Sequence, residues 1–236
     1  MSFLSVLFFI FYFFISSKVP LGAVSSLSED RLEDMVEKYL DKMIQHTGQY
    51  FVRVYPAGLR TDSGNYSPLP GLIAGCQLVS LNFQTSDKYL NMFRAFFSDN
   101  GGCGYVLKPA AVNFLSSMQD PPAMVKPIKL TVHLVSAVQL AQSDDGDGDD
   151  HKAIDPYVKV KVYGVKDDET KAKSKTMKDD ALNPVWNDTF EFQVTRPDVA
   201  LLRFVVMDRD TWGRDDFVAQ YTVPIRMIRQ GLQLIS

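Results

Sequence analysis

Residues 157–165 read YVKVKVYGV, and apolar and polar side chains alternate along this run. The same alternation, with many β-branched residues, occurs in IKLTVHLVSAVQL (128–140), NDTFEFQV (187–194) and ALLRFVVMD (200–208). Successive side chains of a strand point to opposite faces, so the pattern predicts strands with one buried face. Turn residues separate the runs at regular intervals, as in an antiparallel β-sandwich. We therefore predict an all-β domain over residues 128–236.

A different pattern precedes this domain. From Ser26 to Thr47, apolar residues recur at the spacing of one helical face: Leu32, Met35, Val36, Tyr39, Leu40, Met43 and Ile44. Acidic residues crowd the first turn, as the helix dipole favours. Ser26 or Ser28 would cap this helix, within a capping box formed by residues 26–29, and Gly48 would end it.

Short β-like runs follow the predicted helix. They are FVRVYP (51–56), CQLVSLNFQ (76–84) and GYVLKP (104–109), with the helical run KYLNMFRAFF (88–97) between the last two. Strand, helix and strand with short connections are typical of parallel α/β units. A complete eight-stranded barrel takes ~250 residues, so residues 25–119 have room for half of one. The proline-rich stretch DPPAMVKP (120–127) predicts a linker between the two domains.

The first twenty residues differ from the rest, with the apolar run FLSVLFFIFYFFI at 3–15. The run is short for a membrane span and lacks the basic start of a signal peptide. Three explanations compete: a signal or anchor, a buried strand, or a non-native start joined to a truncated coding sequence. We favour the third, although hydropathy alone would score the run as a signal or membrane segment.

Composition narrows the class of protein. Hydrophobic residues make up 46% and charged residues 22% of the 236 residues, which is the balance of a globular protein. A formal net charge of -3 argues against a nucleic-acid binder but leaves a membrane-surface protein open. The two cysteines, Cys76 and Cys103, are interpreted as buried, reduced thiols of a cytosolic protein.

Two acidic clusters flank the predicted strands of the second domain. They are SDDGDGDD (143–150) and, within MDRDTWGRDDF (207–217), four aspartates. Converging carboxylates repel one another unless a cation lies between them, and calcium takes six to eight oxygen ligands from flexible loops. The first cluster lacks the twelfth-position glutamate of an EF-hand. The alternative is that residues 144–150 form a solvated loop and the later aspartates form turns.

Three sequence motifs of the second domain resemble those of the C2 domain in order and spacing: IDPYVKV (154–160), LNPVWNDTFEF (182–192), and LRFVVMDRD (202–210) with DDF after it. The resemblance implies a calcium cluster held by Asp155, Asp208, Asp210 and Asp216, with Asp149 or Asp150 as secondary candidates. Calcium would then bridge the loops to anionic lipid headgroups. Trp212, at the tip of the third loop, would enter the membrane interface or pack as a surface aromatic. C2 domains end with a further strand, which this chain is expected to lack.

Three sequence motifs of the first domain resemble the C-terminal catalytic half of eukaryotic, δ-like phosphoinositide-specific phospholipase C. They are RVYPAGLRTDSGNYSP (53–68), GCQLVSLNFQT (75–85) and NGGCGYVLKP (100–109). In that family a TIM-like barrel cleaves phosphatidylinositol bisphosphate to diacylglycerol and inositol trisphosphate, with two histidines and a calcium ion. The resemblance assigns headgroup contacts to Ser26, Arg53 and Tyr55, whose groups suit phosphate and inositol oxygens. Ser26 has a rival role as helix cap, and Tyr55 as a core residue.

Two departures from the family matter. Leu59 stands where the family commonly has a membrane-inserting tryptophan, so apolar membrane contact is kept without the indole. The family's catalytic histidines and catalytic calcium ligands lie in the N-terminal half of the barrel, and none of that half is found here. No catalytic motif of the family includes any of the three histidines, which are His46, His133 and His151.

Two hypotheses of function remain. The first is a phosphoinositide phospholipase C fragment, inactive in isolation, which supplies headgroup contacts and calcium-dependent binding to anionic phospholipid membranes. The second is a non-catalytic, calcium-dependent phospholipid-binding module. Assembly with a separately encoded N-terminal catalytic half is a further option. Each implies a cytoplasmic protein that is peripheral at the membrane.

Overall fold

The computed structural model describes residues 22–109, 112, 126–141, 154–210 and 213–235. The chain forms two compact units, residues 1–90 with 107–124, and residues 91–106 with 125–236. The apolar segment 1–20 and residues 120–125 of the predicted linker lie outside the described residues, so the domain boundaries stay predictions. No described helix is long and apolar enough to cross a membrane.

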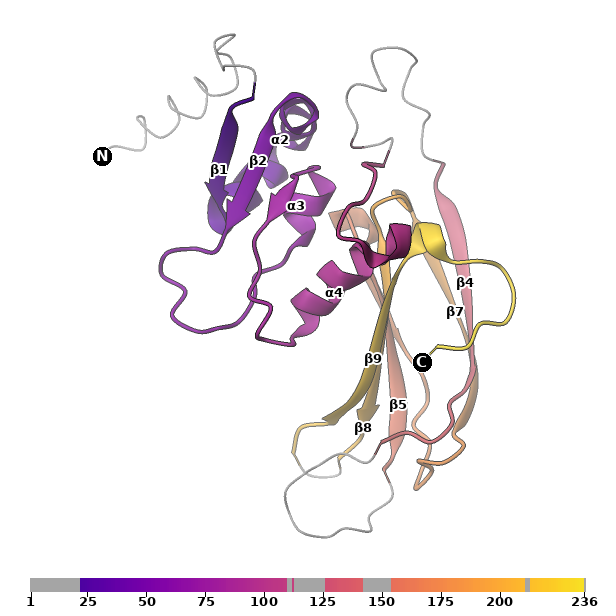
Figure 1. Cartoon of the computed structure of the whole chain (residues 1–236). Coiled ribbons are helices and arrows are strands. Elements are labelled where there is room, and N and C mark those ends of the chain that lie inside the picture. Colours follow the sequence, from indigo (N-terminus) through magenta and orange to yellow (C-terminus); the bar gives the residue numbers. More distant parts are fainter. Residues whose placement is uncertain (1–21, 110–111, 113–125, 142–153, 211–212, 236) are drawn as a thin grey trace. The chain divides into compact units, whose positions relative to one another are not determined.

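The first unit is built on a parallel sheet with the order β1 (Val24–Ser28), β2 (Phe51–Tyr55) and β3 (Leu78–Val79). Helix α2 (Glu29–Gln49) connects β1 to β2, and α3 (Leu69–Ile73) precedes β3 (Figure 1). The buried core joins Leu32, Met35 and Met43 of α2 to Val52 and Val54 of β2. The predicted parallel α/β architecture is therefore confirmed.

The predicted start of the long helix is wrong. Ser26 lies in β1, where residues 24–28 pair in register with residues 51–55, and the helix begins only at Glu29. Ser28 occupies the N-cap position, but its side chain makes no capping hydrogen bond, so the predicted capping box is absent. The apolar helical periodicity starts at Leu32, which leaves the preceding residues available for strand pairing.

The predictions for residues 76–109 were only partly confirmed. The helix predicted at 88–97 is α4 (Lys88–Phe96), and its first N–H groups, those of Tyr89 and Leu90, donate to Asp87 Oδ1. The run 76–84 forms only the short strand β3, and 104–109 forms none. The short 3₁₀ helix η1 (Asp99–Gly102) precedes that run, with Gly101, Gly102 and Gly104 at positive φ. Cys76 is buried as predicted, but Cys103 is exposed in this glycine-rich loop, which corrects its assignment to the core.

The second unit contains two antiparallel sheets. One has the order β4 (Ile128–Ser136), β7 (Val185–Val194); the other has the order β6 (Thr170–Lys173), β5 (Pro156–Tyr163), β8 (Leu201–Asp208), β9 (Asp216–Pro224). Short 3₁₀ helices, η3 (Lys166–Asp168) and η4 (Ile225–Met227), follow β5 and β9. The four predicted strand runs correspond to β4, β5, β7 and β8.

A buried core joins the two sheets of the second unit. It includes Val158 and Leu202 from one sheet and Phe192 and Val194 from the other, so the predicted sandwich is confirmed. Through residue 235, the described chain forms no strand after β9.

Candidate functional site

Ser26, Arg53 and Tyr55 lie on one face of the parallel sheet. Ser26 and Arg53 are register partners on β1 and β2, and both side chains are exposed. Tyr55 ends β2 on the same face, with the Arg53 guanidinium carbon 5.8 Å from its ring centroid. Helix α2 covers the opposite face, where Val52 and Val54 are fully buried. The structure thus brings the three predicted headgroup residues together on the sheet's open face.

The same open face carries large apolar side chains. Val24 pairs with Phe51, and Leu78 pairs with Arg53; these three apolar side chains are 55%, 53% and 47% exposed, respectively. An apolar row beside an arginine is unusual for a solvated face of a sheet.

The loop after β2 is fixed by an ion pair that the sequence analysis missed. Glu29, directly after β1, accepts hydrogen bonds from the Ala57 N–H at 2.8 Å and from Arg60 Nε and Nη2 at 3.0 and 2.7 Å. Burial disfavours the Glu29 carboxylate, but these donors outweigh it and lower its pKa. Arg60 is exposed as a residue, and 28% of its side-chain surface remains accessible beside Glu29. Leu59 projects from the loop and is 94% exposed.

The sequence would indicate this ion pair only once residues 24–28 were recognised as a strand. Parallel strands end at the same edge of a sheet, so a glutamate following one strand meets the loop that follows the next.

Three of the predicted calcium ligands lie at one end of the four-stranded sheet. Asp155 precedes β5, and Asp208 is the register partner of both Pro156 and Asp216. The Asp155 N–H donates to Asp208 Oδ1 at 2.7 Å, and Asp155 Oδ1 accepts from the Asp179 N–H at 2.8 Å.

The described residues include only part of the predicted calcium cluster. Asp210 follows the end of β8, while Asp149, Asp150 and Trp212 lie outside the described residues. Within the described ranges, no three acidic, histidine or cysteine side chains converge closely enough to hold a metal ion. Asp155, Asp208 and Asp216 nevertheless offer the carboxylate oxygens that calcium prefers.

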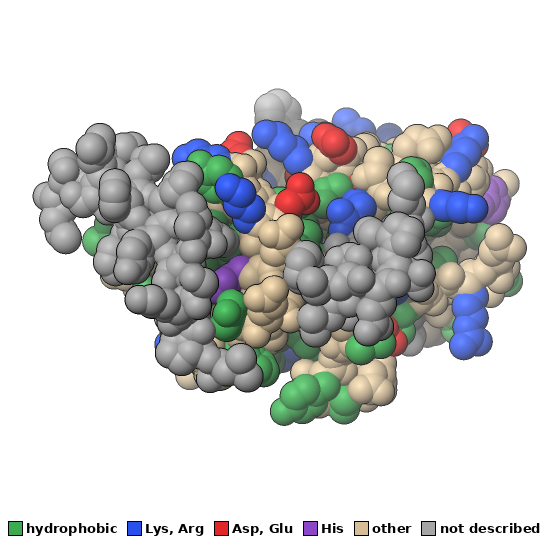
Figure 2. All heavy atoms as spheres, turned by 90° about the horizontal axis from the view of Figure 1, so that it is seen from above, with side chains coloured by type: hydrophobic (Ala, Val, Ile, Leu, Met, Phe, Trp, Pro, Cys, Tyr) green, Lys and Arg blue, Asp and Glu red, His purple; other side chains and the backbone are tan. Residues whose placement is uncertain are grey.

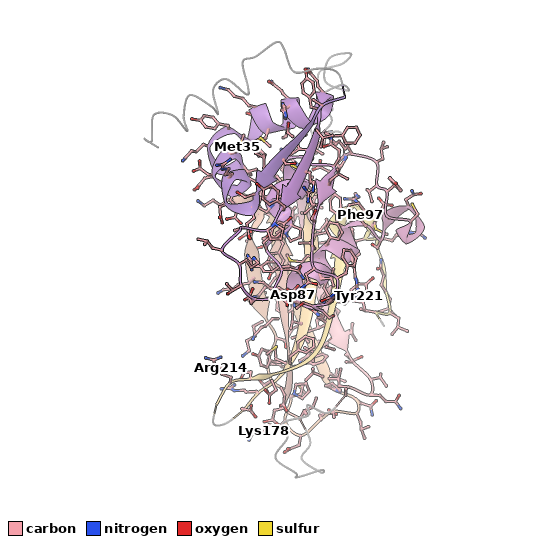
Figure 3. The ribbon with its side chains drawn as sticks, turned by 60° about the vertical axis from the view of Figure 1, so that its left-hand side comes forward. Met35, Asp87, Phe97, Lys178, Arg214 and Tyr221 are labelled. Atoms are coloured by element: carbon pink, nitrogen blue, oxygen red, sulfur yellow. The ribbon has the colours of Figure 1, made fainter. Side chains whose placement is uncertain are left out.

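Basic residues lie at the same end of the sandwich. Figure 3 places Lys178 and Arg214 there, and both side chains are exposed. An anionic surface approaching this end would meet these cations around the acidic residues.

Comparisons with known proteins agree with this geometry. Residues 10–111 match the family "Phosphatidylinositol-specific phospholipase C, Y domain", and residues 128–234 match the family "C2 domain". The chain is 38% identical over 215 residues to the 1-phosphatidylinositol 4,5-bisphosphate phosphodiesterase delta-4 of Homo sapiens, covering 90% of this chain and 28% of that protein. It is 37% identical over 213 residues to the delta-1 enzyme of Rattus norvegicus, covering 88% and 28%. The crystal structure of L. pealei PLC21 superposes with a TM-score of 0.72 at 30% identity, covering 86% of this chain and 26% of that one.

The chain is a phospholipase C Y domain followed by a C2 domain. It is homologous to the δ-type phosphodiesterases and spans just over a quarter of the length of the curated relatives it matches.

In the Y domain, the one described histidine lies away from the headgroup residues. His46, near the end of α2, is buried, and its Nε2 lies 3.3 Å from Ser25 Oγ. Burial lowers its pKa. Ser25 is buried with the helix-covered face, whereas Ser26 and Arg53 lie on the open one. His46 therefore belongs to the core of the Y domain.

In the C2 domain, Asp215 has a partner that sequence reasoning missed. The Tyr157 hydroxyl donates to Asp215 Oδ2. This hydrogen bond, with help from Lys173 and Lys159, lowers the Asp215 pKa, while burial and the same carboxylate raise that of Tyr157. His133 bonds to Thr189 and Asn187 across β4 and β7. His151 is not among the described residues.

Proposed function

We propose that this chain is the membrane- and headgroup-binding part of a phosphoinositide phospholipase C. In the assembled enzyme, which hydrolyses phosphatidylinositol bisphosphate to diacylglycerol and inositol trisphosphate, Ser26, Arg53 and Tyr55 hold the headgroup. The arginine binds a ring phosphate, and the two hydroxyls bond phosphate or inositol oxygens. Leu59 contacts the membrane at the rim.

The open face of the Y-domain sheet is the observation that carries this proposal. Arg53 and Ser26 are exposed there among Val24, Phe51 and Leu78. A second half-barrel placed on this face would cover the apolar row and enclose the arginine. The acid and base for catalysis would come from that half, because the described histidine of the Y domain, His46, lies in its core.

The C2 domain binds anionic membranes in this proposal through calcium. Asp155, Asp208, Asp210 and Asp216 would hold the ion at the end of the sandwich, and calcium would bridge these carboxylates to lipid headgroups. The acidic residues that meet at the ends of β5, β8 and β9, with Lys178 and Arg214 nearby, support this arrangement. The protein would then act in the cytoplasm as a peripheral membrane protein. Trp212 remains a proposed membrane contact.

A nucleic-acid partner is not supported. The net charge is -3, and on the face seen in Figure 2 the described basic side chains are interspersed with acidic and apolar ones.

A second candidate is a calcium-dependent phospholipid-binding module without catalysis. The placement of His46 favours it for the chain acting alone, since this histidine lies in the core of the Y domain and not with Arg53 and Tyr55. Both candidates share the calcium-dependent step and differ only in whether an assembled enzyme turns over substrate.

Two measurements test the proposal. Incubated alone with phosphatidylinositol bisphosphate in mixed micelles, the chain should release no inositol trisphosphate above blank. Co-sedimentation with vesicles containing phosphatidylserine should require calcium and should be lost in Asp208→Asn/Asp210→Asn. The control Asp167→Asn/Glu191→Gln changes the charge equally at positions outside the acidic cluster and should bind normally. Calcium-independent binding of the same strength in every variant would remove the metal site.

A further inference from the structure

One strand of the C2 domain has an edge to which no described strand is paired. Among the described residues, β4 pairs with β7 on one side and with no strand on the other (Figure 1). The backbone hydrogen bonds that continue this ladder past Ser136 also go to the residues before β7. An unpaired strand presents a row of N–H and C=O groups to which another strand can add. We call the unpaired side of residues 128–136 the β4 edge.

The other three sheet edges in the described part of this domain are protected. β6 has only four residues, and two of them are lysines. β9 begins with Asp216 and ends with Pro224, and a register shift interrupts its pairing with β8. The end of β7 is held by the buried Asp168, which accepts hydrogen bonds from the Thr195 and Arg196 N–H groups. Short strands, charges, prolines and bulges are the means by which proteins block pairing at an edge.

β4 lacks these protective features. It is nine residues long and contains no proline. Its two ionisable side chains are engaged across the ladder to β7. Lys129 forms an ion pair with Glu191 at 2.9 Å, and His133 bonds to Thr189 and Asn187. Both groups are therefore held on the β7 side of the strand, away from its open edge.

The apolar side chains of β4 are also less covered than those of its neighbour. Ile128 and Leu130 pack on the sandwich core and are half-buried, whereas their register partners Val194 and Phe192 are buried. This difference lies on the side of β4 that has no neighbour, because β7 covers the other side. A further strand with apolar residues on its inner face would cover Ile128 and Leu130.

We propose that the β4 edge binds the same edge of a second copy of this chain, with the two strands antiparallel and centred on Val132. Residues directly opposite each other in an antiparallel pair point to the same face, so core-facing residues must meet core-facing ones. The register centred on Val132 uses the whole strand. It places Leu130 opposite Leu134 on the inner face and Thr131 opposite His133 on the outer face. The result would be one continuous sheet of β7, β4, β4 and β7.

The neighbouring registers are less favourable. Centring on Thr131 would place Lys129 opposite His133, and centring on His133 would place two imidazoles opposite each other. In the register centred on Val132, Lys129 lies opposite Val135, so no like charges meet across the new ladder. This self-association goes beyond the proposed headgroup and calcium sites and uses none of their residues.

Sedimentation velocity of the full chain over a concentration series is the test. We expect a reversible shift from the mass of one chain toward that of two. Val135 is 39% exposed, so Val135→Lys should fold normally, but it sets a cation opposite Lys129 of the partner subunit. Two such like-charge pairs per dimer should weaken association about tenfold. Val135→Glu sets an anion opposite the same lysine and should associate at least as tightly as the original chain.

The matched control is Val185→Lys, which adds the same charge at an exposed position on β7 and should associate as the original chain does. A crosslinking experiment reports the register. With the exposed Cys103 replaced by serine, Val132→Cys should form a disulfide-linked dimer in glutathione disulfide, because opposite Cα atoms lie about 4.5–5.5 Å apart. Thr131→Cys should form none, since it would face His133 of the partner subunit.

Three outcomes would overturn the proposal. The first is a single species of monomer mass at every concentration. The second is a dimer that Val135→Lys leaves unchanged; its loss in Phe51→Thr/Leu78→Thr would place the contact on the open face of the Y-domain sheet. The third is a dimer that Leu232→Ser/Leu234→Ser abolishes and Val135→Lys does not, which would place the contact on the exposed C-terminal residues.

Discussion

Single carboxylates do two different things in this chain. Glu29 is buried and fully bonded by Arg60 and the Ala57 N–H, and so it ties the loop that carries Leu59 to the start of α2. Asp155 and Asp208 instead lie at an open sheet end and use part of their bonding capacity on backbone N–H groups. The first arrangement fixes a loop, whereas the second joins the residue before β5 to the end of β8 and to the Asp179 backbone.

Replacing Glu29 should loosen the rim loop. Glu29→Gln loses the charge that holds the Arg60 guanidinium, and we expect a loss of about 2 kcal/mol in the free energy of unfolding at pH 7. Denaturant unfolding measures this loss. Asp34→Asn removes an exposed ion pair with Lys38 on the same helix and should cost no more than about 0.5 kcal/mol. A Glu29 variant as stable as the Asp34 variant would show that the contact does not hold the loop.

The Glu29 contribution should depend on pH in one direction. Its pKa is lowered in the folded protein, so the folded state binds fewer protons than the unfolded chain. The stabilisation is therefore present above the ordinary glutamate pKa and is lost as pH falls through the folded value. Stability curves of the original chain and Glu29→Gln should begin to converge near the unfolded-state pKa of about 4.3 and should meet only below the lowered folded value. Curves that stay parallel down to acid pH would contradict this assignment.

At the scale of elements, a buried aspartate in one turn of the C2 domain links its two sheets. Asp168, at the end of η3, is completely buried and accepts hydrogen bonds from the Thr195 N–H and hydroxyl, both at 2.6 Å, and from the Arg196 N–H at 2.9 Å. The turn between β5 and β6 is thereby joined to the end of β7. The position of β5 and β6 relative to the β4–β7 sheet depends on this link.

Asp168→Ala should destabilise the C2 domain strongly. Three donors would lose their acceptor, and each buried group left unsatisfied costs about 1–3 kcal/mol. Thermal unfolding followed by circular dichroism measures the effect. Its exposed neighbour gives the control, because Asp167→Ala should leave the melting temperature nearly unchanged. Equal behaviour of the two variants would show that the link is dispensable.

Elements of this chain differ in how far sequence alone predicted them. Strands with long alternation, such as β5 and β8, were predicted because periodicity reports one buried face. β1 was missed because its residues, VSSLS, carry little apolar signal and their pairing with β2 comes from a distant segment. The run 104–109 was predicted as a strand from its apolar residues, yet the glycines beside it favour a turn.

The candidate site residues also differ in how far the sequence predicted them. The resemblance to the family named Ser26, Arg53 and Tyr55, and the sheet register brings them together. Side-chain contacts such as Glu29 with Arg60 and Tyr157 with Asp215 join residues 31 and 58 positions apart, which no local pattern reveals.

At the scale of the whole molecule, the described residues of the Y domain leave one face of its sheet open. Its parallel sheet is covered by helix α2 on one face, while the face with Arg53 is open among the described residues. Parallel sheets are normally covered on both faces, and a barrel covers the inner one with its own remaining strands. The C2 domain has a complete core by contrast, because its two sheets cover each other.

Catalysis should therefore be recoverable by supplying the other half of the barrel. We expect inositol trisphosphate release from phosphatidylinositol bisphosphate when the chain is mixed with the N-terminal barrel half of a δ-type relative, and none from either part alone. Phe51→Thr/Leu78→Thr should reduce this release at least tenfold, because the docking face loses apolar area while the exposed positions contribute little to the chain's own stability.

The matched control is Val138→Thr/Leu182→Thr, which changes exposed apolar residues of the C2 domain and should leave the recovered activity intact. Arg53→Ala should abolish release while still allowing the two parts to associate, as measured by size-exclusion chromatography. Association lost together with activity in Arg53→Ala would make that residue part of the docking face rather than a headgroup ligand. Stable association with no activity in the original pair would favour the binding module without catalysis.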